Sequence, residues 1–235
     1  NIETADLVKF STAVIAGLSA SQVGGLSDGQ IAALTTDQAA GMTATQVGAL
    51  SVGQIAALET GDLAKLNTSA ITALSTSHMG ALSGAQVAAL STDQVSRLSA
   101  AQIGAIDPGQ IASLTTTQAS ALTATQASGL TPSQIAQMET VDLAKLSTAA
   151  IAGFSTAQIA ALTGAQLAAL DTTQISKLSA TQIGAIDSTA LQSLTTAQAS
   201  ALTAAQASGF SAGQLGALES VDQAALSTAL VAALT

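Results

Sequence analysis

The chain has 235 residues, a net charge of −9 from fourteen acidic and five basic side chains, a mean hydropathy of +0.50 and no cysteine. Binding to a phosphate backbone relies on Lys and Arg, so this charge argues against a nucleic-acid partner, and the lack of cysteine excludes a disulfide framework. Polar residues interrupt every apolar run well before the roughly 18 residues that a membrane-spanning helix needs, so we expect no membrane insertion.

From Glu3 to Leu234 the sequence is an unbroken run of twenty-nine octapeptides. Each octapeptide, or octad, is a variant of S-T-A-Q-I-A-A-L, which occurs unaltered at Ser155–Leu162. We number the positions of the octad p1 to p8, with Glu3 at p1. A strict short period indicates that one small structural unit is stacked many times. The sequence therefore predicts a single repeat array over residues 3–234.

Each octad carries the signals of a helix start. Position p1 is Ser, Thr, Asp or Asn in twenty-five octads and p4 is Gln in nineteen, which together make a capping box, as in Ser155 with Gln158. Pro108 and Pro132 both stand at p2, the first helical position, where a missing N–H costs nothing. All acidic residues lie at p1 to p4 and all basic residues at p7, which complements a helix dipole that restarts in every octad.

The apolar pattern agrees with short helices. Position p8 is Leu, Ile, Met or Phe in every octad, and p5 is Ile, Val, Leu or Met in twenty-three. In one continuous helix an eight-residue period would drift around the axis and would form no fixed stripe. We predict an all-α solenoid with one short capped helix per octad, from p2 to about p7, and a corner at p8 and p1. Position p6 is mostly Ala, Gly or Ser, so we expect neighbouring backbones to approach closely there. Ile159 and Leu162 represent the interior, and the number of octads per coil stays open.

The octads also repeat in blocks of eighty residues. E-T-G-D-L-A-K-L at Glu59 returns as E-T-V-D-L-A-K-L at Glu139. We interpret eighty residues as the unit of duplication. The predicted copies are 59–138 and 139–218, with a shortened copy over 3–58 and a partial copy over 219–234.

Candidate catalytic residues are sparse. His78 is the only histidine, and because it stands at p4, where Gln is usual, we interpret it as a surface substitution. The chain has no cysteine nucleophile, and its glycines are scattered through helical positions and form no phosphate-binding loop. We expect that the protein is not an enzyme and that it needs no cofactor.

The E-T-x-D octads contain the best candidates for a metal site. Glu59 with Asp62, and Glu139 with Asp142, could supply part of a calcium site, which needs six to eight oxygen ligands, if an adjacent coil added carbonyl groups. The alternative, which the sequence favours, is that these acids stabilise the first turn of a helix and that a lysine at p7 balances their charge. Calcium therefore remains the weaker hypothesis.

The string of L-[ST]-x-x-Q-[IV]-A-A-L units resembles the long octapeptide-repeat arrays of large secreted or surface proteins of Gram-negative bacteria, which carry adhesin-like or haem-utilisation labels. The resemblance covers the whole chain and implies an extracellular or cell-surface location and a repetitive structural role. The sequence gives no support to the haem label. The chain has no Cys or Tyr, and its only possible iron ligands of the usual kinds are His78 and the three methionines, Met42, Met79 and Met138.

These observations predict a structural segment that acts as a spacer, a stalk or part of a filament. The alternative is an adhesin-type binding module that engages a protein or polysaccharide, although the surface has few of the aromatic side chains that dominate binding hot spots. Rows of Ser and Thr at p1 and p2 could instead order water or ice, but helix capping already requires them. Neither end has a markedly polar octad, so we expect that the array continues in a longer parent chain or that subunits stack head to tail.

Overall fold

The computed structural model describes residues 3–234. Over this range the chain forms twenty-eight α-helices and one 3-10 helix, η1, and contains no strand. The structure divides into two compact units, unit 1 up to Ala121 and unit 2 from Leu122. The prediction of an all-α solenoid with one short helix per octad is confirmed.

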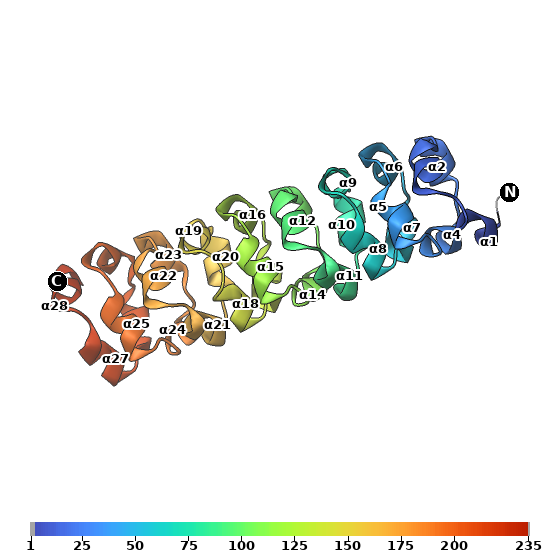
Figure 1. Cartoon of the computed structure of the whole chain (residues 1–235). Helices are drawn as coiled ribbons and strands as arrows, with labels where there is room; N and C mark the ends of the chain where they lie inside the picture. The colour runs from blue at the N-terminus through green and yellow to red at the C-terminus, as the bar shows by residue number, and fades with distance from the viewer. Residues whose placement is uncertain (1–2, 235) are drawn as a thin grey trace. The chain divides into compact units, whose positions relative to one another are not determined.

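The helices of unit 1 run from the blue to the green part of the ribbon (Figure 1). They are α1 (Thr4–Leu7), α2 (Thr12–Gly17), α3 (Ala20–Gly24), α4 (Asp28–Ala32), α5 (Thr36–Ala40), α6 (Ala44–Gly48), α7 (Val52–Ala57), α8 (Thr60–Lys65), α9 (Thr68–Thr72), α10 (Thr76–Gly80), α11 (Gly84–Ala89), α12 (Thr92–Arg97), α13 (Ala100–Gly104), α14 (Pro108–Ile111) and α15 (Thr116–Ala121).

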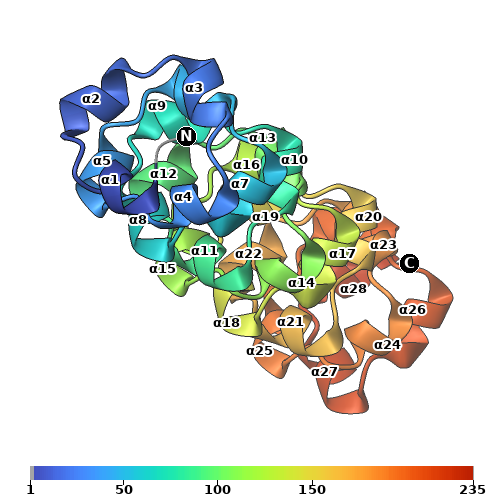
Figure 2. The same cartoon turned by 90° about the vertical axis from the view of Figure 1, so that its right-hand side faces the viewer.

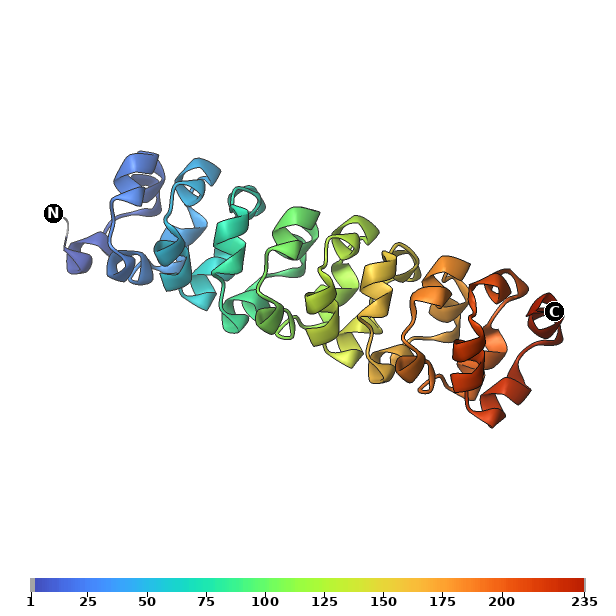
Figure 3. The same cartoon turned by 180° about the vertical axis from the view of Figure 1, so that it is seen from behind.

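The helices of unit 2 continue from green through yellow to red and are seen from behind in Figure 3. They are α16 (Ala124–Ser128), α17 (Pro132–Gln137), α18 (Thr140–Leu143), α19 (Thr148–Ala152), α20 (Thr156–Ala160), α21 (Gly164–Ala169), α22 (Thr172–Ser176), α23 (Ala180–Ala185), α24 (Ser188–Leu191), α25 (Thr196–Ala201), η1 (Ala204–Gly209), α26 (Ala212–Ala217), α27 (Ser220–Ala225) and α28 (Thr228–Leu234).

Local backbone geometry explains why each helix begins and ends where it does. Ser155 at p1 is extended, with φ −67° and ψ 160°, and its hydroxyl accepts a hydrogen bond from the backbone N–H of Gln158 at 3.2 Å. Leu170 at p8 returns to an extended conformation, with φ −65° and ψ 143°. Pro108 and Pro132 are the first helical residues of α14 and α17. The chain therefore starts a new helix after each p1 and turns a corner at p8.

The interior is lined by the two positions that the sequence predicted. Ile159 at p5 is fully buried and Leu162 at p8 is almost so, and the same holds for the equivalent residues through most of both units. Isolated helices of five or six residues are unstable in water, because nucleation is costly and few hydrogen bonds repay it. Burial of p5 and p8 between coils is what stabilises them.

Helices three apart in chain order pack against each other within each unit, such as α5 with α8 and α4 with α7 in unit 1, and α16 with α19 in unit 2 (Figure 2). The side-chain hydrogen bonds between coils span 25 residues at the shortest, from the Thr12 hydroxyl to the Asp37 carbonyl. They span 31 at the longest, from Gln38 to Leu7. One coil therefore contains between three and four octads, a number that the sequence left open.

Backbones approach closely at p6, as predicted. A Cβ atom added to Gly24 would lie 3.1 Å from the carbonyl oxygen of Ala49, and one added to Gly80 would lie 3.1 Å from that of Ala105. Both contacts join p6 of one octad to p7 of the octad three further along the chain. The small residues at p6 allow consecutive coils to stack without a gap.

Candidate functional site: the glutamine ladder

The glutamine at p4 is buried between coils, where one side chain makes contacts in two directions. Gln158 is 2% exposed. Its Oε1 accepts the backbone N–H of Ser155 at 2.8 Å, which completes the capping box of α20. Its Nε2 donates to the backbone carbonyls of Ala127 at 3.0 Å and Leu130 at 2.7 Å, both in an octad of the preceding coil. The same amide thus helps to cap its own helix and joins two coils by hydrogen bonds.

This arrangement recurs through both units, and we call it the glutamine ladder. Each member donates from Nε2 to the p8 carbonyl 28 residues earlier, and most also reach the p5 or p6 carbonyl of the same octad. The members with these bonds inside unit 1 are Gln38, Gln46, Gln54, Gln86, Gln94, Gln102 and Gln118. In unit 2 they are Gln158, Gln166, Gln174, Gln182, Gln198, Gln206 and Gln214.

The sequence predicted the capping half of this role and missed the half that joins coils. One signal could have revealed it. A capping box accepts Glu as readily as Gln at p4, yet none of the twenty-nine octads has Glu there. The two side chains differ in the N–H donors that only Gln supplies. The use of Gln in nineteen octads and of Glu in none therefore indicates that acceptors face p4.

The interpretation of His78 as a surface substitution is wrong. His78 is 6% exposed, because p4 faces the preceding coil rather than solvent. Its Nδ1 accepts the backbone N–H of Ser75 at 3.2 Å, so the imidazole takes the place of the Gln Oε1 in the capping box. The physical role of His78 is that of a buried helix cap.

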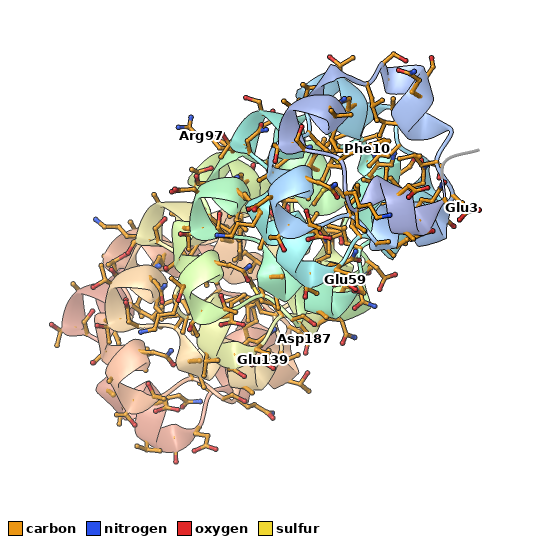
Figure 4. The ribbon with its side chains drawn as sticks, turned by 45° about the vertical axis from the view of Figure 1, so that its right-hand side comes forward. Glu3, Phe10, Glu59, Arg97, Glu139 and Asp187 are labelled. Carbon is orange, nitrogen blue, oxygen red and sulfur yellow. The ribbon has the colours of Figure 1, made fainter. Side chains whose placement is uncertain are left out.

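The four calcium candidates split into two exposed and two buried residues. Glu59 and Glu139 are exposed at p1, and neither side chain caps its helix (Figure 4). Asp62 and Asp142, at p4, are 3% and 2% exposed. Burial raises the pKa of both aspartates; a hydrogen bond from the Thr36 hydroxyl partly offsets this for Asp62. Within residues 3–234 no three His, Cys, Asp or Glu side chains gather into a metal-binding group, and calcium stays an untested prediction.

Most exposed side chains at p1 to p3 are small and polar, with scattered charges and a few valines such as Val52 and Val141. Arg97 extends outward from α12 (Figure 4) and lines a shallow hollow of about 190 Å³ together with Thr68, Ser69 and Thr72. The ion pair between Lys9 and Asp6, at 3.0 Å, joins two largely exposed side chains, so it contributes little to stability. None of the described helices is long and apolar enough to cross a membrane.

A family model of the ALTTAQ repeat matches residues 1–36, 55–92, 77–107, 88–116 and 135–172, which together cover more than half of the chain. The chain belongs to the ALTTAQ repeat family. None of the curated proteins that were compared with it matches. In A-L-T-T-D-Q at Ala33–Gln38, Leu34 lines the interior, Thr35 caps α5 and Gln38 joins the ladder. The ALTTAQ motif thus specifies the residue that lines the interior, the residue that caps the helix and the residue that bonds to the preceding coil.

The two faces of an ALTTAQ coil differ chemically. In the first coil of unit 1 the p4 groups are uncovered, so that Gln22 is exposed and Val14 is 46% exposed. In the last coil of unit 2 the p5 groups are uncovered instead, so that Gln223 is exposed and Val231 is 45% exposed. One face of a coil therefore presents p4 side chains, and the other presents p5 side chains with the backbone carbonyls that p4 amides bind.

Proposed function

We propose that this ALTTAQ array is a structural segment of a bacterial extracellular or surface protein, where it acts as a spacer, a stalk or part of a filament. The glutamine ladder is the observation that carries the proposal. Each ladder bond runs from a side chain to a backbone carbonyl, so it depends little on which octad lies in the neighbouring coil. A fold of this kind can be lengthened by adding octads, which is the property that a spacer needs.

The composition of the exposed positions supports a passive surface. Small hydroxyl and methyl side chains dominate, and the chain contains three aromatic residues in all. The only histidine is already used as a buried helix cap, and the net charge is acidic. We therefore propose a role without catalysis, without a cofactor, and without a nucleic-acid partner or membrane insertion.

The natural partner for the end of a coil is another coil. A p4 face carries amide donors, and a p5 face carries apolar side chains and carbonyl acceptors, so the two are complementary in both polarity and hydrogen bonding. We propose that the uncovered faces receive further octads, either from a longer parent chain or from a second copy stacked head to tail.

Variants of different length test the spacer role. Deleting residues 59–138 removes one whole block, and duplicating the same block adds one, without disturbing the octad phase. In small-angle X-ray scattering we expect the maximum dimension to change in direct proportion to the number of octads. A maximum dimension that grows only as the cube root of chain length would contradict the spacer role. Electron microscopy at increasing protein concentration tests head-to-tail stacking, and short isolated particles at every concentration would contradict it.

An adhesin-type binding module is the alternative, and one observation favours it. The hollow beside Arg97 offers a guanidinium and three hydroxyl-bearing residues, a set that suits an acidic sugar. A glycan array with the wild type and with Arg97→Ala separates the two functions. Specific glycan binding that Arg97→Ala abolishes would support the binding module over the passive spacer.

A further inference from the structure

Aspartate interrupts the glutamine ladder at p4 of the E-[TS]-x-D octads. Asp62 in unit 1 and Asp222 in unit 2 are each 3% exposed. By the register of the ladder, Asp62 faces the octad that contains the carbonyls of Ile31 and Leu34, 31 and 28 residues earlier. Among residues 3–234 no glutamine of the ladder donates to these two carbonyls, because the p4 residue in that register is Asp62 itself.

A hydroxyl group donates to the carboxylate at this position in both units. The Thr36 hydroxyl, from α5, donates to the carboxylate of Asp62. In the equivalent place of unit 2, Thr196 Oγ1 donates to Asp222 Oδ1 at 2.9 Å. The other oxygen of Asp62, Oδ2, is buried and has no hydrogen-bond partner. An ionised carboxylate has no N–H or O–H of its own, and it is costly to bury when one of its oxygens lacks a donor.

The charged groups around Asp62 do not compensate for this burial. Its own octad carries Glu59, whose negative charge adds to the rise in the Asp62 pKa that burial mainly causes. Lys65, at the other end of α8, is exposed. The helices that pack against α8 are α5, whose charged residue Asp37 is exposed, and α11, which has none. The flanking α7 and α9 have no charged residue either, and Asp28 on α4 is exposed. No buried cation therefore pairs with Asp62.

We propose that Asp62 is a proton-binding position. When it is protonated in acid, it joins two coils as a ladder glutamine does, and when it is ionised at neutral pH, this contact is lost. In its neutral form the carboxyl group has one oxygen that accepts the Thr36 hydroxyl and an O–H that donates to a carbonyl of the facing octad. It then does what Nε2 does at every glutamine of the ladder. In its ionised form it loses that donor and leaves a buried charge unpaired.

The sign of the pH dependence follows from linkage. The pKa of Asp62 is raised in the folded state, so the folded protein binds the proton more tightly than the unfolded chain does. The stabilisation is fully present below the ordinary aspartate pKa of about 3.9 and is lost as the pH rises through the folded pKa. Asp142, eighty residues on, also has a raised pKa and a buried oxygen, Oδ1, without a partner.

Hydrogen exchange of the full chain tests the proposal. We would compare the wild type with Asp62→Asn, whose amide supplies the missing donor at every pH. Asp93→Asn is the control, because it removes the same charge from an exposed site. Between about pH 3 and about pH 7.5, protection factors of amides in α5 and α8 should be highest in acid, in the wild type and in Asp93→Asn. They should fall as the pH rises from the ordinary aspartate pKa of about 3.9 through the folded pKa of Asp62, by at most about tenfold per pH unit for one proton. In Asp62→Asn they should stay constant.

Two results would overturn the proposal. If the protection factors of α5 and α8 depend on pH equally in the wild type and in Asp62→Asn, the Asp62 proton does not control the contact between these helices. If calcium chloride raises the protection factors at neutral pH in the wild type but not in Asp62→Asn, Asp62 belongs to a metal site instead. Asp62→Gln provides a further check, since the full ladder side chain should raise the protection of α5 and α8 at neutral pH.

Discussion

Replacing Gln158 by Glu separates the two roles of the ladder side chain. Glutamate keeps an oxygen that can accept the Ser155 backbone N–H, now at 2.8 Å, because Glu and Gln serve equally at this position of a capping box. It removes the Nε2 donor that binds the carbonyls of Ala127 and Leu130. Any loss of stability therefore reports on the contact between coils and not on the helix cap.

The expected magnitude follows from the contacts of Gln158. Two hydrogen bonds are lost at about 1 kcal/mol each. The side chain is 2% exposed, so the new carboxylate oxygen is buried without a donor, which adds about 1–3 kcal/mol. We expect Gln158→Glu to lower the free energy of unfolding by about 3–5 kcal/mol at neutral pH. In an array with nearest-neighbour coupling the loss should concentrate in the coils on either side of α20.

Gln22 provides the matched control. It forms the same capping box with Ser19 but is exposed in the first coil. Gln22→Glu should change the free energy of unfolding by less than about 0.5 kcal/mol. Guanidinium unfolding gives both values, and hydrogen exchange locates the loss. Equal destabilisation by the two substitutions would refute the assignment of the ladder as the contact that holds coils together.

Three further predictions follow from the packing. Leu162→Ala should lower the free energy of unfolding by about 2–5 kcal/mol in guanidinium unfolding, because it leaves a cavity in the interior wall. Gly209→Ala should destabilise the protein by about 1–3 kcal/mol, because its Cβ would overlap the Ala180 carbonyl. Gly216→Ala should stabilise the protein by about 0.5–1 kcal/mol, because its Cβ would meet nothing within 4 Å. Thermal unfolding that ranks the two variants in the opposite order would contradict this geometry. Deleting the octad Ser155–Leu162 should preserve the helical circular dichroism and cooperative unfolding, and deleting half an octad should weaken both, because it breaks the octad phase between neighbouring coils.

The local chemistry of each octad can be read from the sequence alone. The position of each helix start follows from a capping residue at p1, a proline at p2 or a charge at the correct end of a dipole, and all of these act within one turn of the chain. The interior positions follow from the same phase, because p5 and p8 are the large apolar positions of a unit that restarts every eight residues. Pro108 and Ile159 therefore lie where the octad pattern predicts.

Packing between coils decided the rest. Whether the Nε2 of Gln158 meets solvent or a carbonyl depends on which earlier octad lies opposite, and that depends on a coil of between three and four octads. No interaction within one octad sets this number, because it arises from the fit of p5, p6 and p8 between neighbouring coils. The same fit buries His78 and Asp62, because both stand at p4, the position that faces the preceding coil.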